Sequence, residues 1–438
     1  MSQNRNYDVI VVGAGIVGAY FARRCAEGGL RVLLVDRRKR EELGGWKNTG
    51  HNLDQRVFRE LPIAPPSEDE TLARIERAVF KPAVGEPFEF DLPMINVRLK
   101  EFTARMVREA EEAEAEFQDE TKVSAPLVEG GAVRGIVAER GGERREVRAK
   151  LVAEVSGIEA VVRSALPAEF GFPAKLSRQD YLLVYGEDWE IGREHKPAFT
   201  YYPKWQGWSG PRQPGVIGIG LGRFAARDED PREMFAEFSR EVWPAGGKRI
   251  WQTFNRVPLR HPLHSFVGDG VLVLGDAACQ GKPLNGEGVS VMLFAAELAQ
   301  EVAVRAVKSG DVSRSALWDY NVRFQRDFGA RFAMFHRLRY ELLRFNQSEQ
   351  EFLFRMRMYG PEEVAGIMGR VEMTLSPGRL LRLLVAAARG LSRPDLLIRL
   401  GRASAEGAQL KRLYENYPRA PEGLPAWIGK VEALYHQT

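Results

Sequence analysis

The first forty residues carry a glycine motif whose place between a strand and a helix strongly limits the fold. Residues 13–18 are Gly-Ala-Gly-Ile-Val-Gly, which is a G-x-G-x-x-G sequence. The apolar run at residues 7–12 is typical of a buried strand, and residues 16–27 are typical of a helix with small residues on one side. A second apolar run at residues 30–35 predicts a parallel partner for the first strand. The chain is therefore expected to begin a doubly wound α/β sheet.

Each glycine of the motif has a physical reason to be glycine. Gly13 permits the tight turn, Gly15 lets the backbone approach a pyrophosphate, and Gly18 lets the helix pack closely on the strand. The start of the helix then offers free amides and a positive dipole end to the phosphates. Asp36 ends the second strand and can accept hydrogen bonds from both hydroxyls of an adenosine ribose. The segment predicts a site for the ADP half of a dinucleotide and leaves NAD and FAD open.

A second motif separates these two cofactors. An apolar strand at residues 271–274 is followed by GDAACQGKPLNGEG at residues 275–288 and then by a long helical pattern. An acidic residue at a strand end, followed by proline and glycines that lead into a helix, suits Asp276 to hold the ribityl hydroxyls of a flavin. The helix start at residues 286–289 would face the flavin pyrimidine edge and stabilise negative charge on the reduced ring. The sequence therefore predicts FAD.

The two motifs together resemble those of the para-hydroxybenzoate hydroxylase-like flavoproteins, and within them the geranylgeranyl reductase family. Lys282-Pro283 and the glycine-rich run after it are similar to that family's GDAAG-x-x-KP-x-x-GGG stretch. The resemblance covers residues 7–163 and 265–305, and the remainder only in its layout. It implies an FAD-dependent oxidoreductase.

The resemblance also implies cofactor contacts outside the two motifs. Arg98 stands where an arginine contacts the cofactor, and Val123 where a backbone group reaches the adenine. The expected cofactor-binding residues are Gly13, Gly15, Ile16, Val17, Gly18, Asp36, Arg37, Arg98, Val123, Gly275, Asp276, Pro283, Gly286, Gly288 and Val289.

The length of 438 residues exceeds the size at which a single hydrophobic core stops growing, so at least two packed domains are expected. The predicted Rossmann-like FAD-binding domain is discontinuous and comprises residues 1–90, 91–165 and 265–310. Residues 166–264, with aromatic-rich strand patterns, predict an inserted, mostly antiparallel β-sheet domain for the substrate. Residues 311–438 predict a C-terminal helical region. The fold class is thus α/β.

Composition and charge exclude several other classes. The formal net charge of +4 and a single short basic block at residues 37–40 give little support to nucleic-acid binding. Only Cys25 and Cys279 occur, without paired Cys/His spacing, so neither a disulfide framework nor a metal site is expected. No segment reaches membrane-spanning length, and the first apolar run is too short for an export signal. We therefore expect a cytoplasmic protein.

From about residue 331 onward, arginine repeatedly alternates with leucine, phenylalanine and methionine. Basic amphipathic helices can lie on a membrane surface or bind an amphipathic partner. An ordinary helical cap on the main body is the favoured interpretation, and peripheral membrane contact is the alternative. The sequence does not predict the oligomeric state.

Titratable residues near the expected flavin are candidates for moving a proton. The resemblance places Cys279 at the flavin's edge, where a thiol could protonate a carbanion; the alternative is a small residue in a tight turn. Lys282 would lie over the isoalloxazine or form a surface salt bridge. The family often carries a cysteine in the loop after the second strand. Residues 44–53 contain none, which leaves Lys47 and His51.

Residues 199–203 match the family's aromatic substrate motif in part. Tyr202-Pro203 fits the motif's Phe-Pro end, whereas Thr200 replaces a tryptophan. Tyr202 and Trp205 are the residues expected to line the substrate pocket.

The alternating glycines at residues 218–222 have the wrong spacing for a second nucleotide site. They predict a strand against which another backbone or a flat ligand lies closely. Since no second glycine-helix unit follows, electrons are expected from transiently docked NAD(P)H or from a reduced carrier protein such as a ferredoxin.

The expected reaction is reduction of carbon-carbon double bonds in a small hydrophobic, isoprenoid-like substrate by hydride from the reduced flavin. A flavin monooxygenase or halogenase acting on an aromatic or polyketide molecule is the alternative. The missing histidine after GDAA, and a WQGW segment that does not match the halogenase motif, count against it. A third hypothesis is a membrane-associated protein that uses FAD for structure or for non-redox chemistry.

Overall fold

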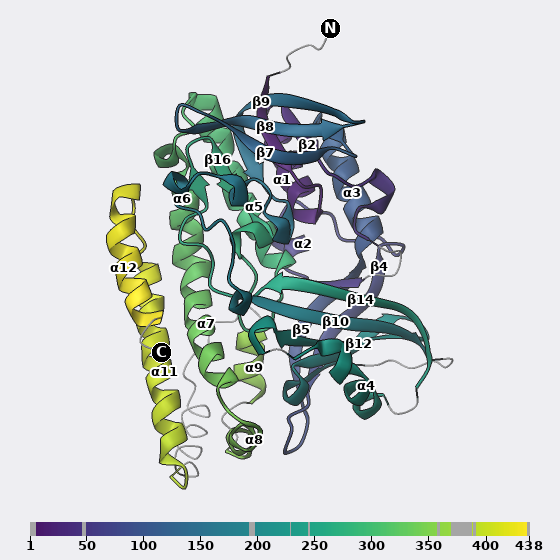
Figure 1. The fold of residues 1–438 in the computed structure, drawn as a ribbon. Coiled ribbons are helices and arrows are strands. Elements are labelled where there is room, and N and C mark those ends of the chain that lie inside the picture. Colours follow the sequence, from purple (N-terminus) through teal and green to yellow (C-terminus); the bar gives the residue numbers. More distant parts are fainter. Residues whose placement is uncertain are drawn as a thin grey trace.

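The computed structural model describes residues 6–45, 50–191, 198–227, 229–243, 246–356, 360–368, 388 and 391–435. Two eight-stranded sheets make up its α/β core, and the C-terminal helices run along one flank of the molecule (Figure 1). The predicted candidate Lys47 lies outside the described residues.

The first sheet confirms the predicted parallel arrangement around the glycine motif. β1 (Tyr7–Val12) pairs in parallel with β2 (Val32–Val35) on one side and with β9 (Glu143–Glu154) on the other. The main strand order is β15-β16-β9-β1-β2-β6, with β15 antiparallel to β16. The remaining strands of this path are β6 (Glu116–Gln118), β15 (Val267–Gly268) and β16 (Val271–Val273). Nearly every residue of β1, β2 and β16 is buried, as expected for a parallel sheet covered on both faces.

Three helices build the layer beside this sheet. α1 (Ile16–Glu27) packs against both α3 (Leu99–Glu112) and α5 (Val289–Ser309). In α3 the buried side chains include Phe102 and Met106, and the outer positions are acidic, as the helical spacing predicts. β7 (Lys122–Glu129) and β8 (Ala132–Arg140) extend β9 as an antiparallel flap.

The second sheet has the order β14-β10-β13-β12-β11-β4-β5-β3 and is antiparallel except where β11 pairs with β4. Its strands are β3 (Gly50–Asp54), β4 (Thr71–Phe80), β5 (Phe88–Arg98), β10 (Tyr181–Glu190), β11 (Phe199–Tyr202), β12 (Gly207–Gln213), β13 (Val216–Phe224) and β14 (Lys248–Pro258). The predicted FAD-binding domain included residues 50–98, yet three strands of this sheet come from them. Long-range pairing, which local patterns do not reveal, decides their place. The domain boundaries stay a prediction.

The second sheet has two different faces. One face packs on α4 (Pro231–Val242) and buries Tyr202 and Trp205 against Phe238. The opposite face, called the inner face below, carries Tyr201 and Phe90 and is partly covered by α9 (Pro361–Met368). Because side chains alternate along a strand, neighbouring residues such as Tyr201 and Tyr202 serve opposite faces.

Glycines 218, 220 and 222 of β13 make room for side chains of the sheet itself. A Cβ added at Gly218 would lie 2.5 Å from Nε of Arg212, and one at Gly220 would lie 2.5 Å from the ring of Trp208. Leu182 of β10 fills the corresponding space at Gly222. The prediction of a closely approaching neighbour was right in its geometry. In the described residues, however, the neighbours are side chains of this chain rather than a backbone or a flat ligand.

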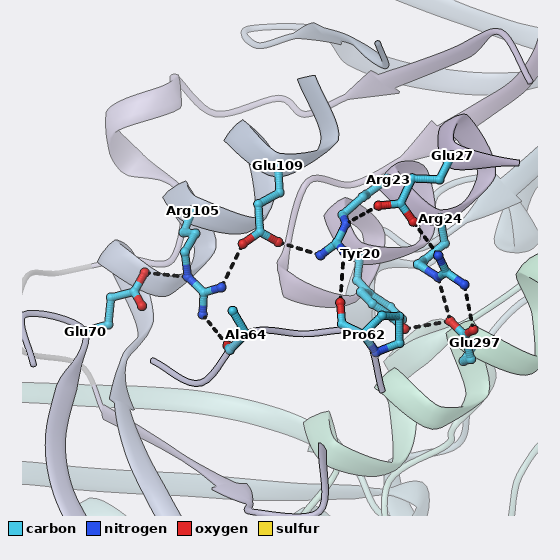
Figure 2. Close-up of polar contacts among 10 residues, drawn as sticks. All are labelled: Tyr20, Arg23, Arg24, Glu27, Pro62, Ala64, Glu70, Arg105, Glu109 and Glu297. Carbon is cyan, nitrogen blue, oxygen red and sulfur yellow. Dashed lines mark hydrogen bonds and ion pairs between the residues drawn. The ribbon is translucent and has the colours of Figure 1, made fainter. Parts of the chain in front are cut away.

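An ion-pair network ties the segment that leads into β4, with Pro62 and Ala64, to the helices α1 and α3 (Figure 2). Arg23 of α1 and Arg105 of α3 both pair with Glu109, each at 2.7 Å. The same two arginines donate to backbone carbonyl oxygens, Arg23 to Pro62 at 2.9 Å and Arg105 to Ala64 at 3.1 Å. We call this arrangement the arginine strap.

The C-terminal part is helical, as predicted. It comprises α6 (Arg314–Phe324), a π-helical turn at Gln325–Gly329, α7 (Ala330–Leu343), α8 (Gln347–Arg355), α9, α11 (Pro394–Glu415) and α12 (Leu424–Tyr435). α7 packs extensively on α11. Among the described helices, none is both long and apolar enough to cross a membrane.

Candidate active site

The glycine turn after β1 has the shape that a pyrophosphate needs. Gly13 has a φ of +111°, and a Cβ there would collide with the carbonyl oxygen of Val155. A Cβ at Gly18 would collide with the carbonyl oxygen of Gly13, so this glycine lets the helix approach the turn. At Gly15 an added Cβ would meet no atom within 4 Å. The turn is therefore tightly packed against the protein at Gly13 and Gly18. It is open at Gly15, next to the first amides of α1.

Asp36 at the end of β2 fixes this turn. Its carboxylate is 6% exposed and accepts hydrogen bonds from the Ala14 amide and from the Arg38 amide, both at 2.9 Å. Burial alone would raise the pKa of Asp36, but the hydrogen bonds and charge of Arg38 and the Ala14 amide hold it below its ordinary value. The group is thus an anion beside the turn, and it can accept hydrogen bonds from ribose hydroxyls.

The second motif places an unpartnered carboxylate at the end of β16. Gly275 has a φ of +69°, and its amide donates to the side-chain oxygen of Gln280 at 2.8 Å. Gln280 in turn donates to the hydroxyl of Tyr320 in α6 at 2.6 Å. Within the described residues, the carboxylate of Asp276 has no hydrogen-bond partner, and desolvation raises its pKa to about 6. Donors such as ribityl hydroxyls would satisfy this carboxylate, so the residues present fit a flavin.

A tightly bonded loop joins Asp276 to α5. The Lys282 amide donates to the Glu287 carbonyl oxygen at 2.8 Å, and the Gly286 amide donates to the Lys282 carbonyl oxygen at 3.0 Å. The Lys282 ammonium pairs with the Glu287 carboxylate at 2.6 Å. Two places were expected for Lys282, either over the flavin or in a surface salt bridge. It is instead 7% exposed and forms a salt bridge inside the protein, within this flavin loop.

The N-terminus of α5 has the open amides expected at the pyrimidine edge of a flavin. Gly288 is its N-cap, and in the described residues no side chain caps this end. Ser290 binds the neighbouring strand, since its hydroxyl accepts from the Asp54 amide of β3 at 3.0 Å. β3 is thereby held beside the flavin loop.

The other predicted cofactor contacts are more dispersed. Arg98 lies at the junction of β5 and α3 and donates to Gln213 at 3.2 Å. Val123 is buried in β7, and Arg37 is exposed directly after Asp36. Their contacts with the cofactor remain predictions.

Cys279 lies in the turn of the second motif. It has a φ of +56° and is 1% exposed. Burial raises the pKa of its thiol to about 12, so the thiol stays protonated and is a poor nucleophile at neutral pH. Both alternatives from the sequence, a proton donor and a small residue in a tight turn, agree with this environment.

Two titratable side chains share the region of Glu287. The pKa of His51 in β3 is held below its ordinary value, mainly by burial and also by the positive charge of Arg212. The negative charge of Glu287 acts in the opposite direction. Burial and the charge of Glu287 raise the pKa of Tyr201, so its hydroxyl stays protonated. His51 and Tyr201 therefore lie near the flavin loop as neutral groups.

The two residues predicted to line the substrate pocket belong to the other face of the second sheet. The Tyr202 hydroxyl lies 3.2 Å from the Ser209 hydroxyl, and the Trp205 indole donates to Glu241 at 2.9 Å. Both rings pack on α4. Tyr201 serves the inner face instead. The alternation of a strand could have separated the two tyrosines, but the sequence does not show which face turns inward.

The structure also brings together a group with metal-ligand chemistry, although no metal was expected. Ligand atoms of His261, His264 and Glu432 lie within 4.8 Å of one another. However, Arg260 can only donate to Nε2 of His261, at 2.9 Å, so Nδ1 carries the proton and donates to the Pro262 carbonyl oxygen at 2.9 Å. Both ring nitrogens of His261 are thus in use, and its ring is buried and stacks on those of His264 and Tyr435.

Comparisons with known proteins agree with this architecture. The model of the FAD binding domain family matches residues 6–321. A digeranylgeranylglycerophospholipid reductase from Sulfolobus acidocaldarius is 26% identical, over 97% of this chain and 96% of the relative.

Solved structures show the same fold. A geranylgeranyl bacteriochlorophyll reductase-like protein from Thermoplasma acidophilum has a TM-score of 0.75 at 19% identity, and the match covers 91% of this chain and 99% of that one. A flavin-dependent brominase has a TM-score of 0.62 at 17% identity, with coverage of 99% and 100%. The fold alone therefore does not separate reduction from halogenation.

Proposed function

Since the chain belongs to the FAD binding domain family and is a geranylgeranyl reductase-like, FAD-dependent oxidoreductase, we propose that it reduces carbon-carbon double bonds of a hydrophobic, isoprenoid-like substrate. The observation that carries this proposal is the match to a reductase of prenyl lipids along nearly the full length of both chains. The inner face of the second sheet, with its apolar side chains, supports it.

The chain's own residues would hold the cofactor at its two ends. The Gly13–Gly18 turn and Asp36 would bind the ADP half, and Asp276 and the start of α5 would bind the ribityl chain and the pyrimidine edge. Bound FAD in its reduced form supplies a hydride. Because α5 directs its N-terminus to this place, its dipole would stabilise negative charge there.

An apolar substrate would lie on the inner face of the second sheet. Phe90 and Met94 of β5 and Phe199 of β11 are buried in one cluster there, and Tyr201 and Trp208 pack against it. Burial of such side chains next to a prenyl chain excludes water from the reacting carbons. We assign delivery of the proton to the Tyr201 hydroxyl, because it is a protonated donor on this face and has no hydrogen-bond partner among the described residues.

Electrons would come from NAD(P)H that docks transiently or from a reduced carrier protein. The β1-α1 turn and the start of α5 are both assigned to FAD, and the space at the glycines of β13 is filled by the sheet's own side chains. Both observations support a donor that docks transiently.

The test is a single turnover without oxygen. The holoenzyme is reduced by dithionite, freed of excess reductant and mixed anaerobically with geranylgeranyl compounds. We expect the flavin to be reoxidised and the product to gain two hydrogens per reduced bond, as seen by mass spectrometry. If reoxidation requires oxygen and yields a hydroxylated or halogenated product from an aromatic compound, the monooxygenase or halogenase alternative holds instead.

A further inference from the structure

A buried arginine-aspartate pair is built into the inner face of the second sheet. Nε of Arg212 in β12 donates to a carboxylate oxygen of Asp188 in β10 at 2.9 Å. The two side chains are 15% and 1% exposed. Gly218 of β13 lies between them, and an added Cβ would come within 2.7 Å of three guanidinium atoms. The glycine thus lets the guanidinium lie flat across the sheet and reach its carboxylate.

Asp188 uses only one edge of this guanidinium. Among the described residues, Nη1 and Nη2 of Arg212 have no hydrogen-bond partner. A guanidinium carries five N–H donors in a rigid planar fork, and its free end matches the two oxygens of a carboxylate or phosphate. The carboxylate of Asp188 therefore orients the arginine while it leaves the end of the fork available.

The free end of Arg212 belongs to the region of the reaction. The charge of Arg212 acts on His51 of β3, which is also within range of Glu287 in the flavin loop. Trp208 lies four residues before Arg212 on the same strand. Its side chain is on the same face of the sheet, over Gly220. An oriented cation thus stands beside an otherwise apolar substrate surface.

We propose that Arg212 determines substrate specificity by binding an anionic group, a phosphate or a carboxylate, at one end of the hydrophobic substrate. This inference rests on the proposed function and goes beyond it. A prenyl chain is a repeat of nearly identical units, so apolar contacts alone fix its register poorly. A single oriented charge fixes one end, and with it the double bond that meets the flavin.

The test measures binding to the oxidised holoenzyme, where no turnover occurs. Geranylgeranyl diphosphate and geranylgeraniol are titrated separately, and the change in the flavin absorbance gives each dissociation constant. In the wild type we expect tighter binding of the diphosphate. Arg212→Gln is expected to weaken diphosphate binding roughly tenfold to hundredfold and to leave binding of the alcohol unchanged, because one charged hydrogen-bonding partner is lost. The dissociation constant of Arg212→Lys for the diphosphate should lie between those of the wild type and Arg212→Gln, since lysine keeps the charge but lacks the planar fork of donors.

A matched control is the ion pair of Arg249 in β14 with Glu187, the residue of β10 next to Asp188. Arg249 pairs with Glu187 at 3.0 Å on the opposite face of the sheet and is 55% exposed. Arg249→Gln should alter neither dissociation constant. FAD content and the melting temperature of each variant report whether the sheet is intact.

Three outcomes would overturn the inference. If Arg212→Gln weakens the binding of both probes equally, or of neither, Arg212 does not bind the anionic group. Double-bond reduction by the wild type would still support the proposed function in that case. If the wild type binds both probes equally well, the anion is not recognised. If it binds neither probe and reduces neither, both proposals fail together.

Discussion

Two glycines of the first motif can be told apart by what surrounds them. Gly15 has a φ of −69°, which alanine adopts readily, and open space around its would-be Cβ. Gly18 faces the Gly13 carbonyl oxygen at a distance that leaves no room for a methyl group. The first glycine is therefore required by the ligand, and the second by the protein itself.

These environments predict opposite phenotypes for two alanine variants. Gly15→Ala should leave the urea midpoint of the apoprotein unchanged and weaken FAD binding by roughly tenfold or more, because the methyl group occupies the path of the pyrophosphate. Gly18→Ala should lower the stability of the apoprotein itself by about 1–3 kcal/mol, as overpacking does. Equal stability of the two apoproteins would contradict this assignment.

The ionised carboxylate of Asp276 is expected to destabilise the apoprotein and to favour FAD binding. Its folded pKa of about 6 lies above its ordinary value of 3.8, so the fold favours the protonated form. Any stability gained from this carboxyl is present below pH 3.8 and is lost as the pH rises through 6. Above that pH, the apoprotein carries an uncompensated carboxylate that flavin hydroxyls would satisfy.

Asp276→Asn should therefore stabilise the apoprotein at pH 8 by about 1–2 kcal/mol, after allowance for its partial exposure, and have little effect at pH 4. The same change should weaken FAD binding, because a neutral amide accepts more weakly than a carboxylate. Thermal unfolding of the apoprotein across pH, with FAD titrations alongside, measures both. A loss of apoprotein stability at pH 8 would show that the carboxylate has a structural partner after all.

The adjacent tyrosines of β11 offer a test of which face carries the chemistry. Tyr201→Phe removes a hydroxyl from the inner face and should lower the rate of substrate reduction by roughly a hundredfold, the usual contribution of a positioned acid. Tyr202→Phe removes a hydroxyl paired with Ser209 in the α4 core and should cost only about 1 kcal/mol of stability. Single-turnover rates and urea midpoints of both variants decide. Equal single-turnover rates for the two variants would show that the Tyr201 hydroxyl does not take part in the reaction.

At the scale of elements, the arginine strap links the two sheets. The segment between α2 (Val57–Glu60) and β4 leads into the second sheet, and Arg23 and Arg105 hold it to α1 and α3 (Figure 2). Glu109 holds both arginines at once and is 19% exposed. Partly buried pairs that share a carboxylate are screened less by salt than exposed pairs.

Glu109→Ala should therefore lower the free energy of unfolding by about 1–2 kcal/mol, and most of this loss should remain at 1 M salt. Glu129→Ala is the matched control, because Glu129 forms an exposed pair with Arg148 and is 47% exposed. Its removal should cost less than that of Glu109, because an exposed ion pair contributes little to stability. Urea unfolding at low and high salt compares the two. A similar small cost for both would mean that the strap does not couple the elements.

The sequence predicted those elements that are determined by residues close together in the chain. The β1-α1-β2 unit and the turn after β16 follow from glycine spacing and apolar runs, and both are found where the sequence indicated. The place of β3, β4 and β5 in the second sheet depends on pairings far apart in sequence, such as Ala78 with Phe199. Arg212 and Asp188 were missed for the same reason, since only the folded sheet brings them together across Gly218.

For the molecule as a whole, the helices after α5 support the flavin site rather than merely covering it. Besides Tyr320, which holds Gln280, the π-helical Gln325 donates to the Leu263 carbonyl oxygen at 2.7 Å. The Leu263 amide donates to Ala278 in the second motif at 3.2 Å. Tyr417, after α11, likewise donates its hydroxyl to the His264 carbonyl oxygen at 2.7 Å, which supports the interpretation of the chain from about residue 331 as a packed cap. Peripheral membrane contact is a separate proposal that concerns their outer surface.

That outer surface carries two exposed apolar side chains near the start of α11. Leu391 is 73% exposed and Ile398 is 70% exposed, and Arg393 lies between them in sequence. Basic and apolar side chains together are what anionic lipid surfaces attract. Much of the preceding basic segment, residues 369–387, lies outside the described residues, so the prediction is confined to this part of α11.

The wild-type holoenzyme is expected to sediment with phosphatidylglycerol vesicles and less with phosphatidylcholine vesicles. Ile398→Asp should reduce binding to the anionic vesicles roughly tenfold, because it removes an apolar side chain from the interface and adds a negative charge to it. Ile250→Asp is the matched control, since Ile250 is an exposed isoleucine on β14 of the second sheet, 38% exposed. If both variants bind like the wild type, a prenyl-lipid substrate would have to reach the inner face by another route than docking of α11 on its membrane.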